Sequence, residues 1–396
     1  MCVSLEVFEE RAKLVIEHFK GLEAKKALVV HHDDADGICS GAIVKRAFER
    51  RGLLLRAVCI EKLIPEAISA IHSERRGLVV YADLGSGHAS EISRTATKGD
   101  VVVILDHHEV QVSEEPNVHH LNLSLFGFDG DRDFSASTCA YLFAKTLDRD
   151  NVDLACLAYV GSMEIPGETS GLNRLALEDA LMTGDAVRRG NKVFLKKLDM
   201  EASKLFSTLQ VLGPVGYYRG GPSLGLKLCT GEDVDEALKV AGELEELRKD
   251  ANRRLLQRLR VEGLNKMRRV QWFSAGQEFL GMGTKVLGSF CSYASYQRSI
   301  VDPDKYLIGM MDMPSIIPEL TTLRGTYTKV SVRAPDKLRA GIERGMAPSS
   351  ALVLSRSCEG FGSADGHAAA ASAVIERGRE MELVDKFDRL ASDWKP

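Results

Sequence analysis

The chain has 396 residues, which is enough for two domains and a large hydrophobic core. Its composition is that of a globular protein, with 44% hydrophobic and 27% charged residues, and its formal net charge is −4. This balance excludes a uniformly basic surface, so any binding to nucleic acid must use a local patch of positive charge. The eight cysteines form no CxxC pair, which favours reduced core thiols and a cytoplasmic protein. We expect no signal peptide, no membrane-spanning segment and no additional domain at either end.

Three apolar stretches near the start of the chain are each followed directly by aspartate or histidine. Aliphatic residues dominate each stretch, as expected for buried strands of a parallel sheet. The polar residues that follow are His31, His32, Asp34 and Asp36 after the first stretch, Asp83 after the second, and Asp106, His107 and His108 after the third. Ligands of open α/β sheets bind beyond the carboxyl ends of the strands, so we expect these side chains to converge on one site.

Helical patterns alternate with these stretches along the N-terminal half of the chain. Apolar residues recur at helical spacing over 5–19, and further helices are expected at 38–50, 66–74 and 89–98. Short strands are expected at 58–60 and 117–122, and two mostly apolar helices at 137–145 and 152–160. This alternation of strand and helix predicts an α/β fold with a doubly wound parallel sheet.

Two loops are expected between these elements. The segment 126–135 places Asp129, Asp131 and Asp133 at alternate positions, as in a calcium-binding loop. It lacks the glycine and the closing glutamate of that motif, so we favour a solvated loop. Pro166 and the neighbouring glycines predict a second loop over 161–168.

The middle of the chain is expected to be helical at 175–200 and at 234–267, with a loop at 213–222. The second of these helices is acidic at its start and basic at its end, with nine basic and two acidic residues over 248–269. This order suits the helix dipole, and a solvated face is the simplest interpretation. We expect the helix to connect two domains. The alternative role is a stripe that follows nucleic-acid phosphates, formed by Arg253, Arg254, Arg258, Arg260 and Lys266.

The C-terminal third is expected to form a second α/β unit. Strands are predicted at 270–273, 306–309 and 327–333, and a helix at 288–296. A glycine-rich loop at 360–367 is expected to open a helix at 368–377, and a helix N-terminus of this kind can cradle a phosphate. The residues that we expect at this phosphate site are Ser331 and Arg333, at the end of a nearby strand, with Gly362 and Gly366 of the loop.

The polar residues at the three strand ends have the chemistry of a metal centre. The expected ligands are His32, Asp34, Asp36, Asp83, His107 and, as a further candidate, His108. Carboxylate and imidazole without thiolate suit manganese, magnesium or zinc, with manganese favoured. More aspartates are present than one ion needs, which favours two ions that together hydrolyse a phosphate ester. The alternative is a set of satisfied core polar residues, and the number of such residues at three strand ends argues against it.

The same residues, taken in order, resemble a known family. His32-x-Asp34-x-Asp36-Gly37, Asp83-Leu84-Gly85-Ser86-Gly87 and Asp106-His107-His108 resemble the first three motifs of the DHH phosphoesterase superfamily. Ser331-x-Arg333 and the segment 365–371 are similar to the substrate-binding motifs of the DHH-associated domain. Within the superfamily the chain most resembles archaeal RecJ-like proteins. The resemblance implies a DHH catalytic domain at 1–190, a helical connector at 191–269 and a DHH-associated domain at 270–396.

The resemblance also implies a role for each motif residue. One Mn²⁺ would be held by His32, Asp34 and Asp83, and a second by Asp36, Asp83 and His107, with Mg²⁺ as a substitute. His108 would contact the scissile phosphate, and Asp106 would support the histidines. Arg333, His367 and the glycine-rich loop would bind a nucleotide phosphate or the terminal base.

The chain departs from the family pattern at two places. The fourth motif of the family supplies an aspartate to the second metal, whereas residues 159–166 here contain no aspartate. Glu164 is the replacement that we expect to serve as a ligand. Asp365 occupies a position where many relatives have glycine, and it places a negative charge beside the expected phosphate site.

Three functions are compatible with these motifs. The first is a manganese-dependent, RecJ-like exonuclease on single-stranded DNA or RNA. The second, favoured by the altered fourth motif, is a weakly active or inactive scaffold that binds the GINS replication complex. The third, favoured by the compact size, is a phosphodiesterase of short oligonucleotides or dinucleotides.

Overall fold

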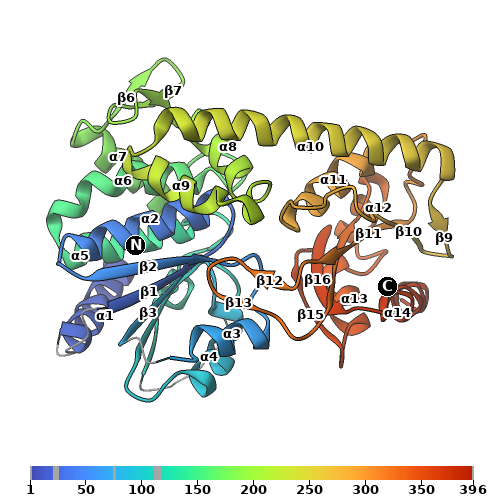
Figure 1. Ribbon diagram of the computed structural model, residues 1–396, viewed down its shortest axis with the longest axis horizontal. Helices are drawn as coiled ribbons and strands as arrows, with labels where there is room; N and C mark the ends of the chain where they lie inside the picture. The colour runs from blue at the N-terminus through green and yellow to red at the C-terminus, as the bar shows by residue number, and fades with distance from the viewer. Residues whose placement is uncertain (1, 21–25, 75–76, 111–116, 395–396) are drawn as a thin grey trace. The chain divides into compact units, whose positions relative to one another are not determined.

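The computed structural model describes residues 2–20, 26–74, 77–110 and 117–394, and Figure 1 labels the helices and strands within them. The chain divides into two compact units. Unit 1 comprises Met1–Gly242 and Pro318–Thr321, and unit 2 comprises Glu243–Ile317 and Thr322–Pro396. The division falls within one long helix, α10 (Val234–Glu262).

A five-stranded parallel sheet is the centre of unit 1, as the sequence predicts. Its spatial order is β2-β1-β3-β4-β5, and its strands are β1 (Lys26–His31), β2 (Leu54–Cys59), β3 (Leu78–Ala82), β4 (Val101–Leu105) and β5 (Val118–His120). The strands β3 and β4 are buried along their whole length, which explains their unbroken aliphatic sequences. The strand order reverses between β1 and β3, and a switch point of this kind is where ligands bind in open α/β sheets.

Helices cover both faces of this sheet. In Figure 1, α2 and α5 lie above the strands, whereas α3 and α4 lie below them. The α-helices before the long connector are α1 (Cys2–Lys20), α2 (Ala35–Glu49), α3 (Pro65–Ile71), α4 (Ala89–Thr95), α5 (Ala136–Leu147), α6 (Ala155–Ser162), α7 (Gly171–Met182), α8 (Ala202–Leu212) and α9 (Gly221–Thr230). Short 3₁₀ turns lie at η1 (Ser86–His88), η2 (Leu123–Phe126), η3 (Arg149–Leu154) and η4 (Tyr217–Arg219).

The predicted helix over 175–200 is wrong. The helix α7 ends at Met182, and three short antiparallel strands follow: β6 (Ala186–Arg189), β7 (Lys192–Leu195) and β8 (Met200–Glu201). Gly184 and Gly190 both adopt positive φ, which ends the helix and turns the hairpin. Val193 and Leu195 are buried on alternate positions of β7, so their period is that of a strand.

Unit 2 contains a mixed sheet in the order β15-β16-β14-β11-β10-β9. The strands β10 and β11 are parallel, and the other neighbours are antiparallel. Its elements are β9 (Asn265–Lys266), β10 (Val270–Ser274), α11 (Lys285–Ser295), β11 (Tyr306–Met313), β14 (Tyr327–Arg333), α12 (Asp336–Glu343), α13 (Ser350–Ser357), β15 (Gly362–Gly366), β16 (Ala370–Glu376) and α14 (Glu380–Ser392). A further two-stranded sheet pairs β12 (Ile316–Ile317) with β13 (Thr321–Thr322).

The predicted helix over 368–377 is also wrong, and with it the helix N-terminus expected to cradle a phosphate. Residues of this segment form β16, and most of the glycine-rich segment forms its hairpin partner β15. Ala371, Ala373 and Ile375 alternate into the hydrophobic core of unit 2, so pairing with β14 overrides the helical preference of alanine. The predicted helix over 234–267 ends earlier, at Glu262, because Gly263 adopts φ +76°.

Among the described residues, no helix has both the length and the apolar character needed to cross a bilayer.

Candidate metal centre

The carboxyl ends of β1, β3 and β4 bring the expected ligands together. His32 and Asp34 follow β1, Asp83 follows β3, and His107 follows β4. Asp34 also caps α2, because its Oδ1 accepts the backbone N–H of Gly37 at 2.9 Å. The site is therefore held by rigid elements at the switch point of the sheet.

Asp83 is the residue on which the site converges. Its side chain is 2% exposed, and its Oδ1 has no hydrogen-bond partner among the described residues. This oxygen lies 3.7 Å from Nε2 of His107 and 3.9 Å from Nδ1 of His108. The other carboxylate oxygen, Oδ2, lies 3.6 Å from Nδ1 of His32. These separations are too long for direct hydrogen bonds and suit donor atoms that share an ion.

The backbone of Asp83 adopts a left-handed conformation with φ +66°. Among residues with a side chain, aspartate and asparagine tolerate this region best. The conformation follows directly after a fully buried strand and turns the carboxylate toward the histidines. Strain of this kind is concentrated at functional sites.

Two groups of side chains have the geometry to hold a metal ion. One comprises His32, Asp34 and Asp83, and the other comprises Asp83, His107 and His108. Within each group the ligand atoms lie within 4.8 Å of one another. Asp83 belongs to both groups, so it is placed to bridge two ions.

The rings of the two histidines after β4 are oriented by the protein. Nδ1 of His107 lies 2.9 Å from the carbonyl oxygen of Gly130 and donates to it, which leaves Nε2 free to face Asp83. Nδ1 of His108 lies 2.7 Å from Oδ1 of Asp106. Gly130 cannot carry a side chain here, because a Cβ atom would lie 2.3 Å from the carbonyl oxygen of His107.

Asp106 supports this arrangement through its hydrogen bonds. It is 1% exposed, and it accepts backbone N–H groups of His107 at 2.8 Å and Ser86 at 2.9 Å. Burial opposes its charge, but the charge and hydrogen bond of His108 lower the pKa of Asp106. Burial also opposes protonation of His108, and the charge of Asp106 overcomes it and raises the pKa of His108 to about 9. The two residues therefore form an ion pair at neutral pH.

The pKa of Asp83 is raised, in contrast to that of Asp106, which is lowered. Burial raises its pKa, and the nearby charges of Asp34 and Asp36 raise it further. Burial lowers the pKa of His32, but the charges of Asp34 and Asp33 outweigh it, so that the pKa lies well above its ordinary value. A divalent cation would relieve this excess of negative charge. The orphaned oxygen, the donor set and the electrostatics therefore all fit a divalent metal ion.

Asp36 and Glu164 lie outside the two groups. Asp36 is in the first turn of α2, and its two oxygens accept the backbone N–H groups of Ala136 and Ser137, each at 2.9 Å. Asp36 thus binds the N-terminus of α5. Glu164 accepts a hydrogen bond from the side chain of Gln210 on α8.

The expected substrate-binding residues belong to unit 2. Ser331 is 1% exposed on β14, and the guanidinium of Arg333 donates to Ser331 at 3.0 Å, to Ser292 at 2.8 Å and to the carbonyl oxygen of Gly288 at 3.1 Å. Gly362, Gly366 and His367 are exposed and lie in or beside the β15–β16 hairpin. Asp365 accepts a hydrogen bond from Ser372 at 2.9 Å.

Several residues that support the candidate metal centre were not predicted from the sequence. Asp33 is fully buried, and its Oδ1 lies 3.3 Å from Nε2 of His32. Asn122 is fully buried and donates to the carbonyl oxygen of His108 at 2.8 Å and to Ser86 at 2.9 Å. Only the position of Asp33 inside the first polar stretch was a signal, because Gly130 and Asn122 act through contacts that span the fold.

The comparison with protein families agrees with this geometry. The model described as the DHH family, N-terminal domain, matches residues 26–162, which include all the candidate ligands of both groups. This part of the chain is a DHH domain. A curated relative of the chain is an uncharacterized protein of Methanocaldococcus jannaschii, which is 31% identical over 159 residues. The alignment covers 38% of this chain and 36% of that protein, so the match spans little more than a third of the relative.

Solved structures extend the likeness beyond the DHH domain. RecJ of Thermus thermophilus in complex with Mn²⁺ is 18% identical, with a TM-score of 0.65, over 98% of this chain and 55% of that chain. An exonuclease RecJ bound to manganese is 18% identical, with a TM-score of 0.61, over 98% and 95% of the two chains. Cdc45 of Entamoeba histolytica is 12% identical, with a TM-score of 0.53, over 98% and 99%. The chain therefore contains a DHH domain and has a RecJ-like fold.

Proposed function

We propose that the protein is a phosphodiesterase that uses two divalent ions, preferably Mn²⁺ with Mg²⁺ as a substitute, to remove terminal nucleotides from single-stranded nucleic acid. The observation that carries the proposal is the buried carboxylate of Asp83, which is shared by two ligand groups within a DHH domain. The RecJ fold supports it, since two RecJ structures similar to this chain contain manganese.

The proposed ligands are divided between two ions. His32, Asp34 and Asp83 hold the first, and Asp83 and His107 hold the second. Asp36 and Glu164, which the family pattern also assigns to the second ion, are engaged by α5 and by Gln210, so they must change partners to reach it. Two such ions supply an activated water and stabilise the charge on the phosphate.

The protein side chains supply orientation and a positive charge. His108 is charged at neutral pH because it is paired with Asp106, and its side chain is 56% exposed. Its Nδ1 is committed to Asp106, so Nε2–H is the group that we assign to a phosphate oxygen. Ser331 and Arg333 of unit 2, with Gly362, Gly366 and His367, are the proposed contacts to the nucleotide.

The test is cleavage of an end-labelled single-stranded oligonucleotide series in Mn²⁺, with Asp83→Asn beside wild type. We expect stepwise loss of terminal nucleotides, reduced at least about a thousandfold in the variant. Asp179→Asn is the matched control, because Asp179 is a buried carboxylate that binds Tyr141 and Lys145 instead of the site. Cleavage confined to the shortest substrates would favour a phosphodiesterase of dinucleotides, and no cleavage at any length would refute the proposal.

A second candidate function is a RecJ-like scaffold that binds the GINS replication complex. The observation that favours it is the engagement of Asp36 and Glu164 elsewhere, which leaves the second ion with fewer carboxylates. The Cdc45-like fold is consistent with it. Capture of purified GINS by both wild type and Asp83→Asn, in the absence of nuclease activity, would support the scaffold.

A further inference from the structure

Unit 2 presents two exposed aromatic side chains on one helix, α11. All nine tyrosines of the chain belong to the described residues, and Tyr293 and Tyr296 are the two that are exposed, by 49% and 58%. They lie three residues apart at the end of the helix, so they are neighbours on its surface. Within the described part of the chain, neither hydroxyl forms a hydrogen bond. The fold therefore leaves both rings open to a ligand.

The hydrophobic packing of α11 does not use these tyrosines. In Figure 1 the helix lies beside β11, which it contacts. Phe290 packs on Phe273 and Phe279, with ring centroids 5.6 and 5.9 Å away. The buried residues of the helix are Val286, Leu287, Phe290, Cys291 and Ala294. Tyr293 and Tyr296 are therefore not needed to hold α11 in place, and two exposed rings side by side are typical of an interaction surface.

The same helix holds the guanidinium of Arg333. The carbonyl oxygen of Gly288 and the hydroxyl of Ser292 accept its N–H groups at 3.1 and 2.8 Å. Ser292 directly precedes Tyr293 and lies four residues before Tyr296, so Ser292 and Tyr296 share one side of the helix. The exposed rings therefore adjoin the polar cluster that the proposed function assigns to the nucleotide.

The charge of unit 2 favours a polyanion. This unit has 24 basic and 19 acidic residues, whereas unit 1 has 28 basic and 37 acidic residues. No aspartate or glutamate occurs between Glu278 and Asp302, the segment that contains α11. The helices α12 and α14 of the same unit instead have acidic residues in their first turns. A polyanion can therefore approach the tyrosines without repulsion from carboxylates of their own segment.

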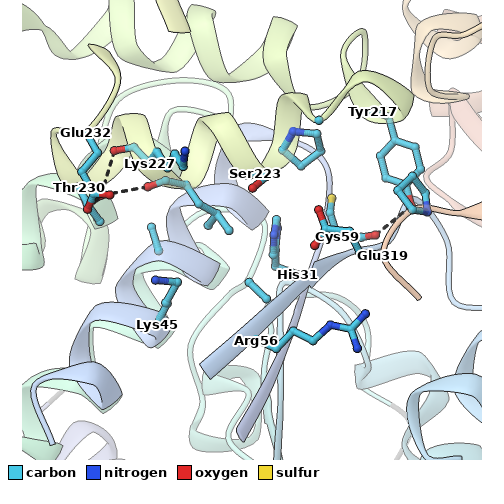
Figure 2. Close-up of a pocket in the computed structure, with 16 residues that line it drawn as sticks. His31, Lys45, Arg56, Cys59, Tyr217, Ser223, Lys227, Thr230, Glu232 and Glu319 are labelled. Carbon is cyan, nitrogen blue, oxygen red and sulfur yellow. Dashed lines mark hydrogen bonds between the residues drawn. The ribbon is translucent and has the colours of Figure 1, made fainter. Parts of the chain in front are cut away.

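The cavity of unit 1 in Figure 2 lacks these features. Its volume is about 290 Å³, and it lies between α2, β2 and α9. Two carboxylates, Glu232 and Glu319, are part of its lining. Its tyrosine, Tyr217, is buried and donates to the carbonyl oxygen of Cys59 at 2.9 Å. A small cavity lined by carboxylates does not suit an extended polyanion, so α11 is the better surface for one.

We propose that Tyr293 and Tyr296 form a platform on which the bases of a single nucleic-acid strand stack. The choice of a single strand as the ligand rests on the proposed function. The open rings, their position beside the Arg333 cluster and the charge of unit 2 carry the assignment to α11. Stacking needs bases that are free of a complementary strand, so the platform selects single strands over duplexes. Every base has a π-face, so the platform accepts any sequence.

The test is the binding of a fluorescently end-labelled single strand of about ten nucleotides, followed by fluorescence anisotropy in EDTA. The full chain carrying Asp83→Asn is the parent protein, so that no cleavage occurs. We expect Tyr293→Ala and Tyr296→Ala each to weaken binding about fivefold or more, because each removes one stacking ring. Phenylalanine at either position keeps the ring and should bind like the parent. Met346→Ala is the matched control, because Met346 is an exposed apolar residue of unit 2 outside α11.

A strand of the same length built from abasic nucleotides separates stacking from attraction to phosphates. The parent should bind this strand about fivefold or more weakly than the ordinary one, and the alanine variants should lose nothing further on it. An equal loss on both strands would show that the tyrosines do not contact bases and would overturn the proposal. Tighter binding of a duplex than of the single strand would also overturn it.

The outcomes distinguish this platform from the proposed nuclease. Binding that depends on both tyrosines, in a protein whose wild type cleaves no substrate, would support the platform and refute the nuclease. Cleavage by wild type, together with alanine variants that bind as tightly as the parent, would refute the platform and keep the nuclease. Self-association that Tyr296→Ala abolishes, without any binding of nucleic acid, would assign this surface to a second copy of the chain and overturn the proposal.

Discussion

The metal centre of unit 1 and the polar cluster around Arg333 in unit 2 are both built on sheets, but they differ in how far their polar groups are satisfied. In unit 1 the buried Oδ1 of Asp83 has no hydrogen-bond partner among the described residues. In unit 2 the guanidinium of Arg333 donates to Ser292, Ser331 and Gly288. The first site stores unfavourable electrostatic energy that an ion would release, whereas the second is stable as it stands. A ligand should therefore change the stability of unit 1 far more than that of unit 2.

The largest effect should come from the metal itself. Mn²⁺ at a hundredfold excess over its dissociation constant should stabilise the protein by about 2.7 kcal/mol, because the ion binds the folded site alone. The measurement is the denaturant midpoint with and without Mn²⁺, with hydrogen exchange of residues 78–110 and 327–376 to locate the gain. Asp83→Asn should lose the effect and Asp179→Asn should keep it. If Mn²⁺ slowed hydrogen exchange equally in both regions, the proposed difference between the two units would be contradicted.

The dependence on pH sharpens the same contrast. Burial and like charges raise the pKa of Asp83, and the charges of Asp34 and Asp33 raise that of His32 against its burial. Both folded-state pKa values lie above the unfolded ones. The ion-free protein should therefore lose stability as the pH rises from the ordinary pKa of each group through its raised folded-state pKa. Metal binding needs both groups deprotonated, so the Mn²⁺ stabilisation should instead grow with pH. Parallel slopes with and without Mn²⁺ would contradict the assignment of Asp83 and His32.

A smaller change in stability is expected from a substitution that disturbs packing and not charge. Gly161 lies at the end of α6, and a Cβ atom there would lie 2.2 Å from Oγ of Ser137 and 2.6 Å from Oδ1 of Asp36. Gly161→Ala should therefore destabilise unit 1 by about 1–2 kcal/mol by overpacking. The denaturant midpoint measures the loss. Gly87→Ala is the control, because no atom lies within 4 Å of its added Cβ, and equal midpoints for the two variants would contradict the packing.

The smallest effect should come from Arg333→Lys in unit 2. Lysine keeps the charge but loses the forked geometry that reaches acceptors on both α11 and β14, so we expect a loss of about 1 kcal/mol in stability. If Arg333 also binds the substrate phosphate, KM for oligonucleotide should rise about tenfold while kcat changes little. Arg298→Lys, at an exposed position of the same unit, is the control. A KM that matches wild type would restrict Arg333 to a structural role.

The sheet of unit 1 could be predicted from the sequence because three of its strands, β1, β3 and β4, are largely aliphatic runs that lead into aspartate or histidine. Asp34, Asp83 and His107 meet for the reason expected, since the carboxyl ends of neighbouring parallel strands share one edge. The direction in which the side chain of Asp36 points could not be predicted. It depends on the position of the N-terminus of α5, whose sequence lies far along the chain.

In unit 2 the secondary structure was harder to predict from the sequence, because small residues such as alanine give little hydrophobic periodicity. The alanines of β16 fit a helix by propensity, and only the pairing with β14 and the burial of Ala371 and Ala373 make the segment a strand. Ser331 and Arg333 were correctly placed on a strand, whose bounds match those expected. Their partners on α11 could not be predicted, since no local pattern relates Ser292 to Arg333.

The left-handed backbone at Asp83 also restricts how this protein can change over generations. Asparagine has nearly the same shape as aspartate and tolerates the same φ, so we expect the protein with asparagine in place of Asp83 to keep the fold. The two residues differ by a single base in their codons. A descendant could therefore lose this carboxylate in one mutational step and keep the fold around it. The geometry that positions the carboxylate thus also leaves a short evolutionary route by which the two ligand groups lose the residue that they share.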